Sequence, residues 1–163
     1  MTVLDTLENG NRHNLDSVQG AIRFIRGDCT ELTDATLACQ NQEIVLNLAA
    51  RVGGIAYNRT HQATMLRDNL AIAATMLEAA RQANIPRFLV VSSACVYPRD
   101  SRVPTPESEG WQGEPEPTNG GYGWAKRMAE KLGYYYAEEF GLQVGIVRPY
   151  NTYGPRDHFN PAT

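Results

Sequence analysis

Two short, almost uninterrupted apolar runs constrain the fold of this 163-residue chain more than any other feature. Residues 43–48 read EIVLNL and residues 87–91 read RFLVV. Such runs are typical of parallel strands that are buried on both faces of a sheet. Between them, apolar residues recur at three- and four-residue spacing from Met65 to Ala80, which predicts a long helix. This alternation predicts an α/β protein whose parallel sheet carries helices on both faces.

Shorter patterns extend the alternation towards both ends of the chain. Further strands are predicted at 2–4, 21–25 and 142–147, and further helices at 31–39 and 121–140, the last ending at Gly141. The polar, proline-rich stretch 98–117 is long for a connection and predicts a functional loop rather than a domain linker. The length favours a single domain over residues 1–163.

Charge and cysteine content exclude several classes of partner. A net charge of -3 with no basic run argues against nucleic acid and anionic membranes. No apolar stretch approaches the roughly 18 residues of a membrane span, and the N-terminus lacks a secretory pattern. Cys29, Cys39 and Cys95 have no metal-ligand spacing, so we expect no metal site. They are interpreted as reduced thiols of a cytoplasmic protein.

Acidic residues end the first two predicted strands, at the edge where open parallel sheets bind ligands. Asp5 fits the acidic residue that bonds the adenine ribose hydroxyls of a dinucleotide and repels a 2'-phosphate. In that role it favours NAD over NADP. The alternative for Asp5 is a residue that only initiates a turn, and Asp28 is equally open between ligand binding and a cap or turn.

Tyr122 and Lys126 are four residues apart on a predicted helix and therefore share one face. A lysine ammonium there, together with a positively charged nicotinamide, favours the phenolate and is expected to lower the pKa of the tyrosine. The tyrosine could then exchange a proton with a sugar hydroxyl. Ser93, at the end of an earlier strand, would stabilise the same oxygen. Cys95 is either a small buried side chain or an acid/base group beside a carbonyl.

Three motifs carry a family resemblance: SSACVYP at 92–98, YGWAK at 122–126 and RPYNTYGP at 148–155. In this order they resemble the extended short-chain dehydrogenase/reductase family, whose NAD-dependent epimerase/dehydratase members have a Rossmann-like fold. Residues 48–55, LAARVGGI, resemble the pocket loop of the GDP-L-fucose synthases and the GDP-mannose 3,5-epimerases. The resemblance implies an enzyme that transiently oxidises sugar C4 of a nucleotide sugar, with GDP as the nucleotide.

The resemblance also implies roles for individual residues. Tyr122 would transfer the proton at C4, Lys126 would hold the nicotinamide ribose, Ser93 would assist, and Cys95 would act at the adjacent carbon. Further cofactor contacts are implied for Leu48, Ala49, Ala50, Pro149 and Asn151, and substrate contacts for Val52, Gly53, Gly54, Ser93 and Asn151. Family members often form homodimers, and we expect the same here.

Members of the family begin with a strand, a Gly-rich phosphate loop and a helix, and none of these precedes Asp5 in this sequence. The strand is expected between those ending at Asp5 and near Leu48. We therefore expect those two strands to close up, to pair with another chain, or to leave the chain poorly stable. A C-terminal substrate domain is also absent, which predicts a fragment inactive alone. The alternative is a non-catalytic Rossmann-like binding module.

Overall fold

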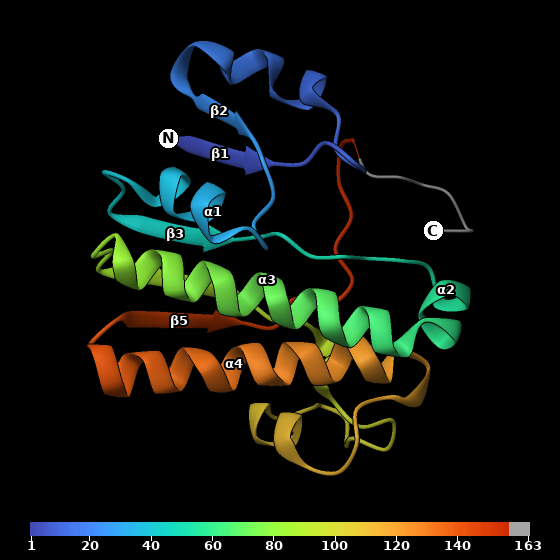
Figure 1. The fold of residues 1–163 in the computed structure, drawn as a ribbon. Helices are drawn as coiled ribbons and strands as arrows, with labels where there is room; N and C mark the ends of the chain where they lie inside the picture. Colours follow the sequence, from blue (N-terminus) through green and yellow to red (C-terminus); the bar gives the residue numbers. More distant parts are fainter. Residues whose placement is uncertain (157–163) are drawn as a thin grey trace.

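The computed structural model describes residues 1–156, which contain five parallel strands in two separate sheets (Figure 1). β1 (Thr2–Asp5) pairs with β2 (Arg23–Arg26), so that Leu4 lies opposite Ile25. β3 (Ile44–Asn47), β4 (Arg87–Val91) and β5 (Gln143–Val147) form the second sheet in the order β3-β4-β5. The predicted α/β class and parallel pairing are confirmed.

Four α-helices connect these strands: α1 (Leu32–Cys39), α2 (Ile55–Thr60), α3 (Gln62–Gln82) and α4 (Gly120–Phe140). Short 3-10 helices cover Arg12–Ala21 (η1), Ala94–Val96 (η2), Glu107–Trp111 (η3) and Pro117–Asn119 (η4). α4 ends where Gly141 adopts the left-handed conformation (φ 73°), as predicted for a C-terminal glycine. Within residues 1–156, none of the helices has the length and apolarity that crossing a bilayer requires.

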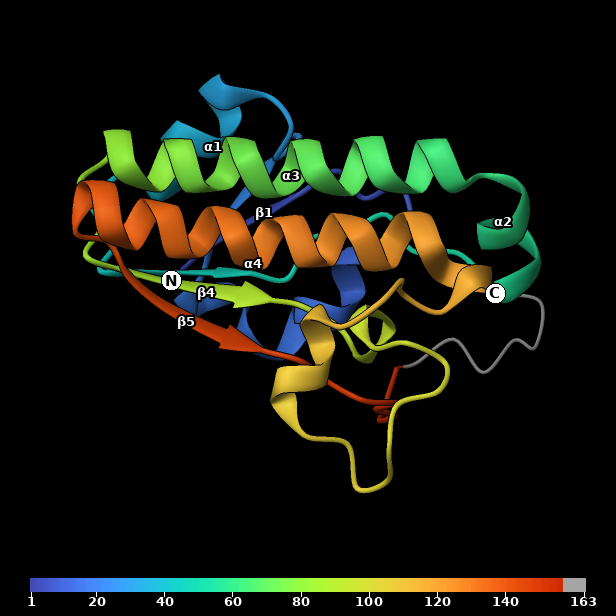
Figure 2. The same ribbon diagram turned by 90° about the horizontal axis from the view of Figure 1, so that it is seen from below.

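The core lies between the three-stranded sheet and helices α1, α3 and α4, which all lie on the same side of the strands (Figure 2). Alternate strand residues such as Val45, Phe88 and Val90 face these helices and are buried. On the other side, Ile44 and Leu46 are 47% and 53% exposed. Burial of the 43–48 strand on both faces was therefore a wrong expectation, because the described helices cover one face of that sheet rather than both.

β1 and β3 do not pair with each other, so direct closure of the sheet, one of the three outcomes expected, does not occur. Helix α1 instead connects the two sheets: it contacts β1 on one side and α3 on the other. Its Ala35 and Cys39 are buried in the common core. Apolar contact of a helix, rather than a ladder of backbone hydrogen bonds, thus joins the β1-β2 pair to the rest of the fold.

One arginine of α4 holds both ends of the long loop between β4 and α4. Arg127, fully buried on α4, donates from Nε and Nη2 to the carbonyl oxygen of Val96 at 2.9 and 2.6 Å. Its Nη1 donates to the carbonyl of Gly113 at 2.6 Å. The predicted functional loop is thereby fixed at its two ends against the helix that carries Tyr122.

Candidate active site

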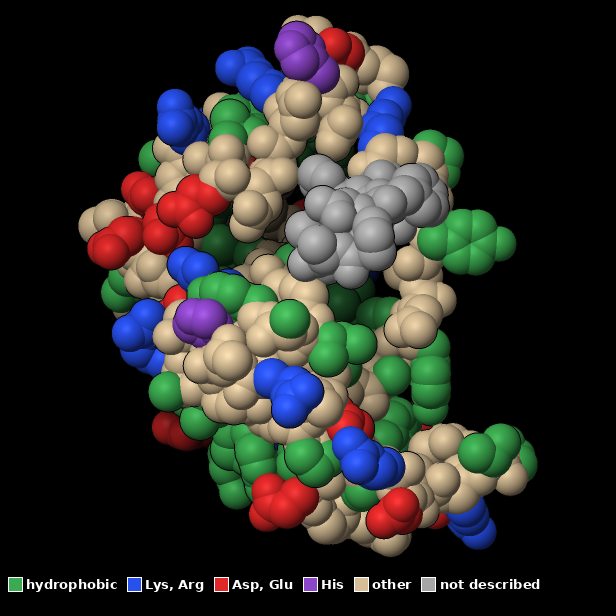
Figure 3. Space-filling model, turned by 90° about the vertical axis from the view of Figure 1, so that its right-hand side faces the viewer, with side chains coloured by type: hydrophobic (Ala, Val, Ile, Leu, Met, Phe, Trp, Pro, Cys, Tyr) green, Lys and Arg blue, Asp and Glu red, His purple; other side chains and the backbone are tan. Residues whose placement is uncertain are grey.

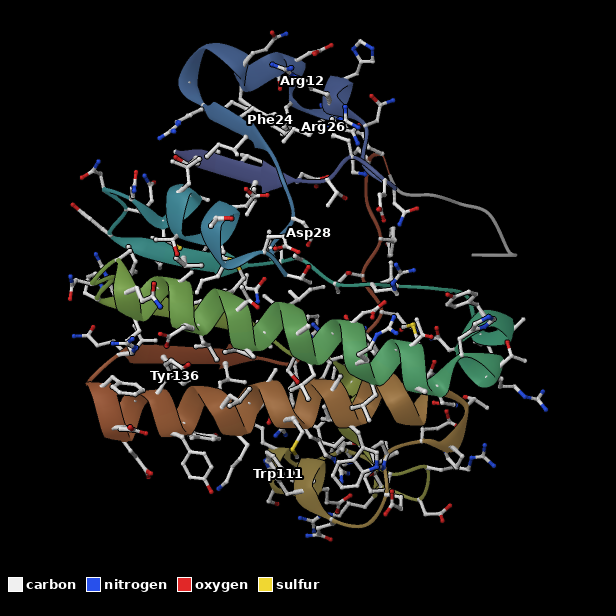
Figure 4. All side chains as sticks on the ribbon, in the orientation of Figure 1. Arg12, Phe24, Arg26, Asp28, Trp111 and Tyr136 are labelled. Atoms are coloured by element: carbon white, nitrogen blue, oxygen red, sulfur yellow. The ribbon has the colours of Figure 1, made fainter. Side chains whose placement is uncertain are left out.

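The carboxyl ends of β1, β2 and β3 enclose a pocket of about 360 Å³, which we call the strand-end pocket. Figure 3 looks onto this edge of the molecule, and Figure 4 places Asp28 between the two sheets. The pocket is lined by Leu4, Asp5, Thr6, Glu8, Asn9, Gly10, Asp28, Cys29, Thr30, Ala49, Ala50, Arg51, Asp68 and Ile72. The structure thus brings together four of the predicted cofactor residues, which are Asp5, Asp28, Ala49 and Ala50.

Both aspartates also stabilise local turns. Asp5 Oδ1 accepts a hydrogen bond from the backbone of Leu7 at 2.7 Å. Asp28 Oδ1 accepts from the backbone and the hydroxyl of Thr30, each at 2.8 Å. Within residues 1–156, the second oxygen of each carboxylate accepts no hydrogen bond. The turn and ligand interpretations are therefore compatible, since one oxygen fixes the turn and the other is free to accept from a ligand hydroxyl.

The loop after β3 is held by Asn69, a residue that the sequence analysis missed. Its amide group accepts from the backbone N–H of Arg51 and donates to the carbonyl of Arg51, both at 3.0 Å. The same side chain donates to the carbonyl of Met65 at 2.8 Å and is 4% exposed. This clamp turns Ala49 and Ala50 towards the strand-end pocket. An asparagine within the apolar stripe of α3 was the signal available in the sequence.

The remaining predicted residues of this loop lie elsewhere. Leu48 and Val52 are exposed and do not line the strand-end pocket. Gly54 is the N-cap of α2, and Gly53 packs so closely on Tyr57 that a Cβ would come within 2.7 Å of its ring. The structure therefore separates the loop into a part that faces the pocket and a part that starts α2.

Helix α4 presents Tyr122, Lys126 and Glu130 at four-residue spacing towards the end of β4. Lys126 Nζ donates to the carbonyl of Val91 at 2.8 Å and lies 5.4 Å from the centre of the Tyr122 ring. On the facing segment, Ser93 Oγ accepts from the backbone N–H of Cys95 at 3.2 Å and caps η2. All four predicted catalytic residues therefore lie on two elements, α4 and the β4–η2 segment, that contact each other.

Glycines on both sides of Tyr122 permit this close approach. A Cβ at Gly123 would collide with the carbonyl oxygen of Cys95, and one at Gly121 with the carbonyl oxygen of Gln62. Gln62 also accepts a hydrogen bond from the backbone of Gly121 through its side chain. The helix start is consequently pressed against both η2 and α3, which fixes the position of Tyr122 relative to Cys95.

Burial controls the ionisation of the pair on α4. Burial, with a smaller contribution from nearby Cys95, raises the pKa of Tyr122 to about 12. Burial also lowers the pKa of Lys126 to about 8, partly opposed by Cys95. In the protein without a ligand, the lysine alone therefore does not lower the pKa of the tyrosine. The lowering expected from the lysine and a positively charged nicotinamide together stays a prediction. The Lys126 ammonium lies over the ring of Tyr122 and is hydrogen-bonded to Val91, so it does not offset the desolvation of the phenol.

A buried ion pair, which the sequence analysis missed, supports the same segment. Arg148 donates from Nε and Nη2 to the two carboxylate oxygens of Glu130, each at 2.7 Å. Glu130 is fully buried and also accepts from the hydroxyl of Ser92 at 2.5 Å. Arg148 continues to the Tyr97 hydroxyl at 3.2 Å, and this network raises its pKa. The signal in the sequence was a carboxylate one turn beyond Lys126 on an otherwise apolar face.

The segment after β5 lies along the catalytic segment. The backbone N–H of Ser92 donates to the carbonyl of Val147 at 2.8 Å, and that of Ala94 donates to the carbonyl of Pro149 at 3.0 Å. Pro149 therefore lies beside the backbone of Ser93 and Ala94. Asn151 is exposed and lines neither the strand-end pocket nor the small cavity near Lys126.

The two halves of the site lie next to each other. A water-sized cavity of about 10 Å³ shares Ala49 and Ile72 with the strand-end pocket and is bordered by Val91 and Lys126. The residues present fit a dinucleotide: a carboxylate at one end for the adenine ribose, a guanidinium in the pocket wall, and an ammonium at the other end. Within residues 1–156, no three His, Cys, Asp or Glu side chains converge as metal ligands would.

Fold and site together define an α/β domain of the dinucleotide-binding class with a tyrosine–lysine pair at its strand ends. A family model described as the NAD dependent epimerase/dehydratase family matches residues 1–163, and the chain belongs to this family. The resemblance drawn from the three motifs is confirmed.

Curated relatives include GDP-L-fucose synthase of Escherichia coli (strain K12), which is 40% identical over 114 residues, or 70% of this chain and 36% of that protein. GDP-mannose 3,5-epimerase of Arabidopsis thaliana is 37% identical over 116 residues, or 68% of this chain and 30% of that protein. The chain thus spans about a third of the length of these two relatives.

Solved structures confirm the Rossmann-like fold. UDP-glucose 4-epimerase from Thermotoga maritima with UDP-glucose superimposes with a TM-score of 0.84 at 26% identity, covering 99% of this chain and 51% of that one. The dTDP-glucose 4,6-dehydratase DesIV from Streptomyces venezuelae, with NAD and DAU bound, gives 0.82 at 26% identity, covering 98% and 50%. The chain corresponds to about half of each of these proteins.

Proposed function

We propose that this chain is the NAD-binding part of a nucleotide-sugar epimerase, dehydratase or reductase, with Ser93, Cys95, Tyr122 and Lys126 as its catalytic residues. The observation that carries the proposal is that the two halves of the site share a wall. Ala49 lines both the pocket that contains Asp5 and the cavity that borders Lys126. A dinucleotide lying along the strand ends would then have its adenine ribose at Asp5 and its nicotinamide ribose at Lys126.

The proton chemistry follows from the two pKa values on α4. With a pKa of about 12, Tyr122 holds its proton at neutral pH and can donate it to the oxygen at sugar C4. Lys126, with a pKa of about 8, is still mostly charged at neutral pH and can donate to ribose hydroxyls. For Tyr122 to accept a proton, positive charge must arrive beside the phenol to favour its phenolate. A bound nicotinamide supplies that charge and takes up or returns the C4 hydride.

Ser93 and Cys95 complete the proposed chemistry on the opposite side. The Ser93 hydroxyl would donate to the same C4 oxygen as charge develops on it. Cys95 lies close enough to act on the ionisation of both Tyr122 and Lys126. We propose that its thiol exchanges a proton at the carbon next to the C4 carbonyl, as the similarity to GDP-L-fucose synthase and GDP-mannose 3,5-epimerase suggests.

The same similarity supports a GDP-sugar as substrate. The two enzymes both act on GDP-sugars according to their names. Substrate contacts are proposed for Val52, Gly53, Gly54 and Asn151, which lie in exposed or half-buried positions outside the strand-end pocket. Leu48 and Pro149 are proposed to contact the cofactor from either side of the β4 end. The chain alone is proposed to be inactive, since it spans about a third of those relatives.

NAD is proposed as the cofactor rather than NADP because Asp5 lies in the wall of the strand-end pocket, where its charge would repel a 2'-phosphate. We also propose a cytoplasmic homodimer. All three cysteines are free, which fits a reducing compartment. Tyr134 and Tyr135 on α4 are each 50% exposed, which fits a dimer contact through this helix.

Nuclear magnetic resonance titration of the 163-residue chain with NAD and with NADP tests the proposal, since it detects even millimolar binding. We expect NAD to shift the amide signals of Ala49, Ala50 and the start of α4, and NADP to bind more weakly. Asp5→Asn should reduce the difference in affinity between NAD and NADP. Glu8→Gln, a control carboxylate in the same pocket wall, should leave it unchanged.

Tighter binding of NADP than of NAD would contradict the role of Asp5. Absence of any shift in a folded chain at millimolar NAD would refute the dinucleotide site and favour a non-catalytic module. Shifts confined to residues remote from both Ala49 and α4 would count equally against the proposed path of the cofactor.

A further inference from the structure

The charged residues that line the strand-end pocket are all acidic except one. Four carboxylates line it, those of Asp5, Glu8, Asp28 and Asp68, and Arg51 is the one cation among its lining residues. A dinucleotide carries a diphosphate between its two riboses, and that anion would be repelled by an all-acidic wall. A diphosphate in this pocket must therefore be bound by Arg51 or by backbone N–H groups.

Arg51 has a backbone held by hydrogen bonds and a partly exposed side chain. Asn69 holds both its N–H and its carbonyl at 3.0 Å, so the position of its Cα is set by α3. Its guanidinium, in contrast, is 44% exposed and has a single recorded partner within residues 1–156, Asp68, at 2.6 Å from Nε. The side chain can consequently turn without disturbing the loop that carries Ala49 and Ala50.

The partner of Arg51 is shared with a second arginine. Arg67 Nε also lies 2.6 Å from Asp68, from the other carboxylate oxygen. The pKa of Asp68 is lowered, first by the hydrogen bond from Arg67 and only then by Arg51. If Arg51 turns away, Asp68 keeps an ion-pair partner, so the movement does not leave Asp68 unpaired.

We propose that Arg51 is the diphosphate ligand of the strand-end pocket, and that its guanidinium moves from Asp68 to the ligand's phosphate oxygens when a nucleotide binds. The inference rests on the proposed function, because it assumes that a dinucleotide occupies the pocket. A planar guanidinium suits two phosphate oxygens at once, and such charge-assisted pairs are stronger than neutral hydrogen bonds. In the free protein, Arg51 forms an ion pair with Asp68, which also pairs with Arg67.

Calorimetric titration with adenosine and with ADP tests the inference, since the two probes differ by the diphosphate alone. We expect Arg51→Gln to weaken ADP binding by about tenfold to a hundredfold, the size expected for a lost charged hydrogen-bond pair. Adenosine binding should stay unchanged. Added salt should weaken ADP binding to the wild type more than to Arg51→Gln.

The matched control is Arg67→Gln, which removes the other guanidinium that pairs with Asp68. Arg67 does not line the pocket. We expect this variant to weaken ADP binding less than Arg51→Gln does, because Arg51 can still reach the diphosphate but must leave Asp68 without a partner. Equal loss in both variants, or ADP binding by Arg51→Gln at wild-type strength, would overturn the inference and leave the proposed function standing. Failure of the folded wild type to bind either probe would refute the nucleotide site itself, and the inference with it.

Discussion

Replacing Lys126 by methionine tests the electrostatics of the site without any ligand. Lys126 is 8% exposed, and burial lowers its pKa from 10.5 to about 8. Between these two values the unfolded chain binds a proton that the folded chain has released. The contribution of Lys126 to the free energy of unfolding should therefore rise as the pH increases from about 8 to about 10.5. At about 1.4 kcal/mol for each unit of pKa difference, the rise amounts to about 3 kcal/mol.

Lys126→Met removes both the buried charge and its hydrogen bond to Val91. The first change stabilises the fold at neutral pH by up to about 3 kcal/mol, and the second costs about 1 kcal/mol. We expect a net gain of about 2 kcal/mol at pH 7 that disappears towards pH 10. Methionine is similar in length and unbranched, so the packing of α4 should be retained.

Urea unfolding of wild type and variant between about pH 7 and pH 10 measures both curves. Lys131→Met is the control, because Lys131 is exposed on the same helix and its replacement should leave the pH slope of the wild type intact. The difference between the two proteins isolates Lys126, because buried Cys39, whose pKa is raised to about 11, lowers the stability of both above about pH 9. A difference that does not shrink between about pH 8 and pH 10, or a variant less stable than wild type at pH 7, would refute the reasoning. Measurements should stop below the range in which Tyr122 titrates, since its raised pKa gives the opposite slope above about pH 10.

Three further changes test the packing around the site. Gly123→Ala should lower the free energy of unfolding by about 1–3 kcal/mol, because the added methyl meets a backbone carbonyl of η2. The control, Gly120→Ala, should change it by less than about 1 kcal/mol. Urea unfolding measures both. Glu130→Ala should cost about 3–5 kcal/mol by thermal or urea denaturation, since a buried guanidinium loses its partner, and a change below about 1 kcal/mol would contradict that burial. Asn69→Ala should accelerate hydrogen exchange at the Arg51 amide, and unchanged protection there would show that the clamp is not what holds the loop.

The order and type of the main elements were predictable because each depends on local pattern. The helix expected at 121–140 is observed at Gly120–Phe140, and the glycine that ends it has the left-handed conformation that favours glycine. The strand runs were also located correctly, but their burial was not. An apolar run shows that a strand tolerates burial on both faces, whereas the actual cover of each face depends on helices from distant segments. Here α1, α3 and α4 all cover the same one.

For the site residues, too, local pattern was predictable and long-range packing was not. Residues at strand ends and the Tyr122–Lys126 pair could be chosen from sequence, since strand ends share one edge of a parallel sheet and helical spacing defines a face. Asn69 and Glu130 could not, because their partners are Arg51 and Arg148, each 18 residues away along the chain. Pairing over such separations is decided by the packing of α3 and α4 against the sheet.

The protonation of Tyr122 in the protein without a ligand also depends on packing, and it changes the interpretation of the pair. Helical spacing correctly put the lysine and the tyrosine on one face, but the effect of the lysine charge depends on where its hydrogen bond goes. Because Lys126 donates to the Val91 carbonyl, desolvation dominates and moves the two pKa values in opposite directions, to about 12 and about 8. The protein alone thus holds a protonated tyrosine, which is prepared to donate a proton. Accepting one requires charge that a ligand brings, so the direction of proton transfer is set by the occupant of the site and not by the tyrosine–lysine spacing.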